Sequence, residues 1–137
     1  MATQNIFHGL GIALITPFAT QGEVDYKALT RLVEYQITNG ADFLCILATT
    51  AETACLTKEE KDKITDLIKT VNHGRVPILK YCGGNNTRAV VEEIKSTDWS
   101  GTDGILSICP YYNKPSQEGI YQHFKAIAEV SPKPLIL

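Results

Sequence analysis

The sequence lacks a strong excess of charge of either sign and has no long apolar run. Its 13 lysines and arginines nearly balance its 15 aspartates and glutamates, for a net charge of −2. This balance gives no electrostatic footprint for nucleic acid or an anionic membrane. No apolar run approaches the roughly 18 residues that cross a membrane. The N-terminus has no basic cluster followed by an apolar stretch, so we expect no signal peptide and a cytoplasmic protein.

No two cysteines are close enough in the sequence for the usual spacing of a metal site. The four cysteines include no C-x-x-C pair. Three of them, Cys45, Cys82 and Cys109, lie in or at the end of apolar, strand-like runs. We therefore interpret these three as small buried thiols of a reduced compartment, and we expect no metal.

The sequence is built from short apolar runs that alternate with longer amphipathic segments. The short runs predict strands over residues 11–16, 42–47, 76–81, 103–108 and 134–137. The longer segments predict helices over residues 25–38, 57–72, 86–96 and 116–129, because apolar residues recur there at helical spacing. Thr57 and Glu60 form a capping-box signature at the second helix, and Ser116 is a capping residue at the fourth.

Four strand–helix repeats indicate βα units and a parallel sheet. The strands begin near residues 11, 42, 76, 103 and 134, about 30 residues apart, and eight such units need about 250 residues, the size of a (β/α)8 TIM barrel. A doubly wound open sheet predicts a glycine-rich phosphate loop after the first strand, which is absent. We therefore expect residues 1–137 to be the N-terminal half of a single TIM-barrel domain, with four and a half of its eight units.

Reactive groups of such a barrel collect on the loops that follow the strands. Thr49 and Thr50 follow the second strand. Their hydroxyls could relay protons and bind a small carboxylate, or serve only in turn and capping hydrogen bonds. Tyr111 and Tyr112 follow the fourth strand. Their phenols could relay protons or bury ring area at an interface.

The end of the third strand carries Lys80 and Tyr81, of which one should point into the barrel because strand side chains alternate. A desolvated Lys80 could attack a carbonyl as an amine. We favour the alternative that Lys80 reaches solvent or that this strand is exposed. Asn85 or Asn86, after two glycines, can cap the next helix.

Together these loops resemble those of the dihydrodipicolinate synthase/N-acetylneuraminate lyase family of class I aldolase-like barrels. The resemblance covers the whole chain, from residues 11–18 through residues 49–53 and 83–87. It is most specific over residues 110–129, which begin Pro-Tyr-Tyr-Asn-Lys-Pro-Ser-Gln-Glu-Gly. The paired threonines and the Tyr-Tyr-Asn-Lys-Pro run resemble the synthase branch of the family rather than the lyase branch.

The resemblance implies a Schiff-base lyase that condenses pyruvate with L-aspartate 4-semialdehyde to 4-hydroxy-tetrahydrodipicolinate in lysine and diaminopimelate biosynthesis, with no metal or organic cofactor. Thr49 matches a proton-relay threonine, and Thr50 matches the threonine that binds the pyruvate carboxylate. Tyr112 matches a relay tyrosine that reaches across a tight dimer interface in a dimer of dimers. Tyr111 and Asn85 match positions that bind the inhibitor L-lysine in some members.

The family's Schiff-base lysine, a second relay tyrosine and a carboxylate-binding arginine follow its fifth strand, beyond the position of Leu137. We therefore expect these 137 residues alone to be inactive. The alternative is a non-catalytic half-barrel that assembles with itself or with a separate C-terminal chain. The resemblance also marks Lys80 and Tyr81 as departures, since the family has small residues there. The large Tyr81 ring could overpack the barrel.

Overall fold

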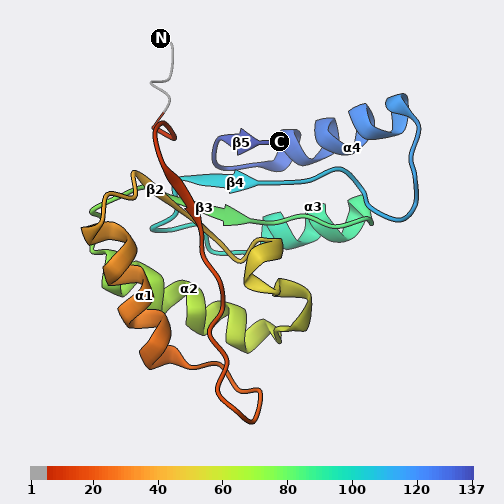
Figure 1. Ribbon diagram of the computed structural model, residues 1–137. Helices are drawn as coiled ribbons and strands as arrows, with labels where there is room; N and C mark the ends of the chain where they lie inside the picture. The colour runs from red at the N-terminus through yellow and green to blue at the C-terminus, as the bar shows by residue number, and fades with distance from the viewer. Residues whose placement is uncertain (1–5) are drawn as a thin grey trace. The chain divides into compact units, whose positions relative to one another are not determined.

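The computed structural model describes residues 6–137 (Figure 1). Residues 1–5, part of the N-terminal segment in which we expect no signal peptide, lie outside the described residues. The elements in chain order are β1 (Gly11–Ala13), α1 (Tyr26–Thr38), β2 (Phe43–Ile46), the short 3-10 helices η1 (Thr49–Ala51) and η2 (Thr53–Cys55), α2 (Lys58–Asn72), β3 (Ile78–Tyr81), α3 (Thr87–Ser96), β4 (Gly104–Leu106), α4 (Gln117–Val130) and β5 (Leu135–Ile136).

All predicted strands and helices are present, and the strands are shorter than the apolar runs that predicted them. The two 3-10 helices between β2 and α2 were not predicted. Among the described residues, no helix combines the length and apolar character needed to cross a membrane.

The chain divides into two compact units, Met1–Leu79 and Lys80–Leu137, and β3 begins in the first and ends in the second. The strands follow one another in sequence order. In the first unit β1 pairs in parallel with β2, from Gly11 opposite Phe43 to Ala13 opposite Cys45. In the second unit β4 pairs in parallel with β5. Each of these parallel pairs is joined through a helix, which is the βα repeat predicted from the sequence.

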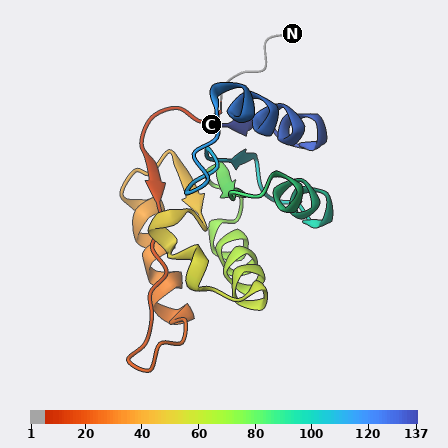
Figure 2. The same ribbon diagram turned by 90° about the vertical axis from the view of Figure 1, so that its right-hand side faces the viewer.

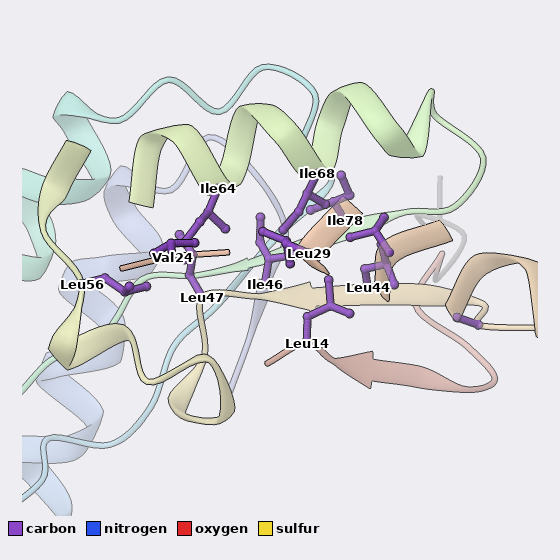
Figure 3. Close-up of a cluster of buried hydrophobic side chains, with 12 residues drawn as sticks. Leu14, Val24, Leu29, Leu44, Ile46, Leu47, Leu56, Ile64, Ile68 and Ile78 are labelled. Carbon is purple, nitrogen blue, oxygen red and sulfur yellow. The ribbon is translucent and has the colours of Figure 1, made fainter. Parts of the chain in front are cut away.

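The core of the first unit lies between its strands and the neighbouring helices α1 and α2 (Figure 3). Ile64 and Ile68 of α2 point toward Leu44 and Ile46 of β2, and Leu29 of α1 joins them. All five side chains are almost fully buried. Each contributes about 1.5–3 kcal/mol relative to exposure, so this cluster holds the helices on the strands.

The second unit has a core of its own. Its helices α3 and α4 are neighbours (Figure 2). Ile94 of α3, Ile105 of β4 and Ile127 of α4 are its fully buried aliphatic side chains. Trp99 closes the cluster, and its indole N–H donates to the Ile94 carbonyl at 2.8 Å. This bond satisfies the one polar group of the ring inside an apolar environment.

Side-chain caps decide where the loops end and the helices begin. The predicted capping box is confirmed, since the Glu60 N–H donates to the Thr57 hydroxyl and the Thr57 N–H donates to the Glu60 carboxylate. Asn86 caps α3, and Ser116 caps α4 by accepting from the Gly119 N–H. The loops that carry the candidate site run from the end of each strand to the cap of the next helix.

The prediction of three buried cysteines is correct for two of them. Cys45 and Cys82 are buried, and burial raises the pKa of the Cys45 thiol to about 11. Cys109 is exposed, so the prediction for it is wrong. The reason is that β4 ends at Leu106, and Cys109 already lies in the loop beyond the sheet.

Candidate functional site

Thr49 and Thr50 lie in η1, directly beyond β2 in the first unit. Both are exposed. Within residues 6–137 neither hydroxyl makes a hydrogen bond, and the hydroxyl that caps α2 belongs to Thr57. The interpretation of this pair as turn and capping hydroxyls is therefore not what the structure shows. Both hydroxyls are open to a ligand.

A threonine that sequence reasoning missed holds this turn. The Thr16 hydroxyl donates to the Ala51 carbonyl at 2.7 Å, and both residues are buried. Thr16 follows β1, and the bond from the Leu14 N–H to the Cys45 carbonyl continues the pairing with β2 up to this point. The sequence does contain a signal for this role: Thr16 carries a hydroxyl at the end of the first predicted strand. In a parallel sheet, that position lies beside the turn that follows the second strand.

The backbone around the threonine pair is strained. Leu47 before it has φ 58° and Glu52 after it has φ 53°. Left-handed backbone is costly for residues other than glycine and persists where the surroundings impose it. Ala51, by contrast, lies outside the left-handed region.

Tyr112 lies in the loop between β4 and α4 of the second unit and is 91% exposed. Its φ is 68°, and the Asn113 N–H donates to the Tyr111 carbonyl across it at 2.8 Å. A bond from residue i+2 back to residue i around positive φ is a rare and strained γ-turn. Lys114, two residues later, also has a left-handed backbone, with φ 48°.

The strained turn is tied to the loop between β3 and α3. The Asn113 side-chain amide donates to the Asn85 carbonyl at 2.7 Å, and the two side-chain amides lie 3.5 Å apart. The structure therefore brings Asn85 beside the turn that carries Tyr111 and Tyr112. Of the predicted site residues, these three share the second unit, while Thr49 and Thr50 lie in the first.

Tyr81 is half-buried at the end of β3. A side chain on Gly83 would approach its ring to 3.1 Å, so this glycine leaves the room that the ring occupies. Burial, and after it the charges of Tyr111, Cys82 and Glu93, raise the pKa of Tyr81 to about 12.

The sequence led us to expect Lys80 to reach solvent, and this prediction is wrong. Lys80 is 9% exposed, and its ammonium nitrogen lies 5.5 Å from the centre of the Trp99 ring. Strand alternation places Lys80 on the same side as Cys82, which packs in the Trp99 cluster, and Tyr81 on the other. An indole face attracts a charged ammonium. The structure therefore buries Lys80 beside the Trp99 cluster of the second unit.

His123, to which the sequence assigned no role, is buried on α4. Its Nδ1 lies 2.8 Å from the Thr87 hydroxyl at the start of α3. Burial lowers the pKa of His123, and the Ile108 carbonyl partly opposes this. The contact joins the first turn of α3 to the second turn of α4. Among residues 6–137, no three His, Cys, Asp or Glu side chains gather as a metal site would require.

Comparisons with known proteins agree over the described residues. The family model "Dihydrodipicolinate synthetase family" matches residues 6–137. A protein named 4-hydroxy-tetrahydrodipicolinate synthase from Phocaeicola vulgatus is 60% identical over 98% of this chain and 45% of its own length. A protein of the same name from Parabacteroides distasonis is 57% identical over 94% of this chain and 43% of its own length. A structure described as chloride-inhibited dihydrodipicolinate synthase from Acinetobacter baumannii complexed with pyruvate matches with TM-score 0.89 and 43% identity, over 94% of this chain and 44% of that one.

The chain therefore spans a little under half the length of the relatives it matches. Together with the parallel sheet, the likeness to solved dihydrodipicolinate synthase structures confirms the predicted fold class, part of a (β/α)8 barrel.

We expect Thr16→Val to lower the free energy of unfolding by about 1–3 kcal/mol, because it leaves the buried Ala51 carbonyl without its donor. Urea unfolding of the purified protein measures this. Thr65→Val is the matched control: Thr65 is also buried, but its hydroxyl donates to the Lys61 carbonyl within the same helix, where the helical N–H remains as a donor. Equal losses in the two variants would contradict the role of Thr16.

The raised pKa of Tyr81 predicts a pH dependence of stability. Because the folded-state pKa of about 12 exceeds the ordinary value of 10.0, the folded state holds the phenolic proton more tightly than the unfolded state. The stability linked to Tyr81 is then fully present below pH 10.0 and is lost as the pH rises toward about 12. Urea unfolding across this range should show a steeper loss for the wild type than for Tyr81→Phe. Parallel curves would rule out the shift.

Proposed function

Because the chain belongs to the dihydrodipicolinate synthetase family, whose model matches residues 6–137, we propose that it is the N-terminal half of the single TIM-barrel domain of a 4-hydroxy-tetrahydrodipicolinate synthase. The observation that carries the proposal is 60% identity to a relative of that name over 98% of this chain. The proposed protein is a cytoplasmic enzyme of lysine and diaminopimelate biosynthesis that uses no metal or organic cofactor.

The proposed reaction condenses pyruvate with L-aspartate 4-semialdehyde. A lysine amine adds to the pyruvate ketone and water leaves, which forms an imine. Loss of a methyl proton turns the imine into an enamine, whose carbon attacks the aldehyde carbon. Cyclisation through the amine of the semialdehyde releases the enzyme lysine and the product. Every step moves a proton, so the site needs groups that both donate and accept.

We assign the proton relay to Thr49 and Tyr112, and the binding of the pyruvate carboxylate to Thr50. Three observations support the assignment. The threonine hydroxyls are exposed and make no hydrogen bond within the described part of the chain. The Tyr112 ring is 91% exposed. Strained backbone lies at Tyr112 itself and on both sides of the threonine pair, as is common at functional sites.

The same exposure supports a homo-oligomer. A tyrosine ring left almost wholly in water on a strained turn gains area when a partner covers it. We therefore propose a tight dimer through Tyr112 and a dimer of such dimers. For Tyr111 and Asn85 we propose binding of L-lysine as an inhibitor, supported by the bond that holds the Asn85 loop to the turn after Tyr111.

Borohydride reduction in the presence of pyruvate tests the proposed chemistry in the full-length gene product. The expected result is one pyruvate adduct, located by mass spectrometry on a lysine outside residues 1–137, together with condensation activity. We expect the 137-residue polypeptide alone to form no adduct and to be inactive. An adduct on Lys80 would overturn the assignment of the nucleophile, and no adduct on the full-length protein would overturn the function. Recovery of activity on adding a separate C-terminal polypeptide would favour the split half-barrel.

Tyr112→Phe in the full-length protein should lower kcat by about 10²-fold or more, because the phenol that moves the proton is removed. The unfolding temperature should stay the same, since the described residues contain no hydrogen bond to this hydroxyl. Steady-state kinetics and thermal unfolding measure the two effects. Tyr35→Phe, which removes another exposed phenol on α1, is the control and should leave kcat unchanged. A Tyr112→Phe enzyme with wild-type kcat would refute the relay.

A further inference from the structure

We propose that Asn113 is a positioning residue for Tyr112. In this proposal the Asn113 side chain anchors the strained turn to the β3–α3 loop and thereby sets where the Tyr112 phenol lies. The inference rests on the proposed function, since it takes Tyr112 to be the proton relay. It concerns the second unit alone, which contains both loops.

Asn113 holds the turn from two directions. Its backbone N–H donates to the Tyr111 carbonyl at 2.8 Å, which closes the turn around Tyr112. Its side-chain nitrogen donates to the Asn85 carbonyl at 2.7 Å, which fastens the closed turn to the neighbouring loop. The second contact between the two asparagines, amide to amide, is longer, at 3.5 Å. The short bond to the backbone carbonyl is therefore the principal anchor.

The turn needs such an anchor because its own conformation is unfavourable. Tyr112 at φ 68° and Lys114 at φ 48° lie on either side of Asn113, and left-handed backbone at such residues costs free energy. The Tyr112 ring is 91% exposed and contributes little packing to offset this cost. Without the side-chain bond, more extended conformations of the turn become accessible, and the phenol moves with them.

The acceptor end of the anchor is itself held in place. Asn85 directly precedes Asn86, whose side chain accepts from the Ala89 N–H and caps α3. The contact between Thr87 and His123 joins the start of α3 to α4, the helix that the turn leads into. The Asn85 carbonyl thus lies directly before the capped start of a packed helix, which makes it a suitable fixed point for the turn.

The expected effect is on kcat rather than on substrate binding. A displacement of about 1 Å in a reacting group can cost roughly 10²-fold in rate. Loss of the anchor spreads Tyr112 over several positions, so the fraction of molecules with the phenol in place for proton transfer falls. The KM for pyruvate should change little, because we assign the pyruvate carboxylate to Thr50.

The test compares two substitutions in the full-length protein. Asn113→Ala removes the side chain. Asn113→Asp keeps its size but replaces the donor with an oxygen that repels the Asn85 carbonyl. Asn39→Ala is the matched control, because Asn39 also donates its side-chain amide to a backbone carbonyl, that of Tyr35, at 2.7 Å on an exposed helix end.

Three readouts are compared: kcat, the KM for pyruvate, and hydrogen exchange of the backbone N–H of residue 113. In both Asn113 variants we expect kcat to fall about tenfold or more, KM to stay within about twofold, and exchange at residue 113 to accelerate by up to about tenfold, the factor that corresponds to one lost hydrogen bond. Asn39→Ala should match the wild type in all three. A fall in Asn113→Ala with recovery in Asn113→Asp would indicate side-chain size rather than the bond, and would overturn the inference.

The exchange measurement separates this inference from the proposed function. An active wild type, with kcat and exchange unchanged in both Asn113 variants, overturns the anchor and leaves the function intact. A wild type without condensation activity overturns the function. In that case exchange at residue 113 still decides the anchoring part of the inference: faster exchange in both variants upholds Asn113 as the residue that holds the Tyr112 turn, and unchanged exchange refutes it.

Discussion

Left-handed backbone at residues other than glycine is the constraint on which the candidate site depends. Such backbone costs of order 1–3 kcal/mol per residue and persists only where other contacts impose it. Leu47 and Glu52 adopt it around the threonine pair, and Tyr112 and Lys114 adopt it around the tyrosine turn. The remaining case among the described residues, His73, is the C-cap of α2, where this conformation is common. The strain therefore concentrates at the two loops that carry the proposed chemistry.

Each strained loop is restrained by one short side-chain hydrogen bond to a backbone carbonyl. The Thr16 hydroxyl bonds the Ala51 carbonyl in the first unit, and the Asn113 amide bonds the Asn85 carbonyl in the second, each at 2.7 Å. In both cases one partner belongs to a neighbouring strand end or loop, so the restraint comes from parallel strands that end at the same edge. The two apolar cores supply the stability that lets these loops keep exposed polar side chains.

Local pattern was enough to predict the strands, the α-helices and several details of their ends. The capping box of Thr57 and Glu60 is confirmed, as are the caps at Asn86 and Ser116, because each involves residues three apart in the chain. The errors concern surroundings. Lys80 is buried against Trp99 instead of reaching solvent. The local pattern around Lys80 could not predict this contact, because Trp99 lies 19 residues later in the chain.

The sequence by itself determined the alternation of strands and helices, the family, and which loops carry threonine and tyrosine pairs, because periodicity, caps and motifs are local. Only the tertiary structure decided that Thr16 holds the threonine turn and that Asn113 holds Tyr112. It also decided that, within residues 6–137, the Thr49 and Thr50 hydroxyls make no hydrogen bond. The Thr16–Ala51 and Asn113–Asn85 bonds join residues 35 and 28 positions apart. They exist because the packing of helices on parallel strands sets neighbouring loops side by side, and this is a property of the folded chain.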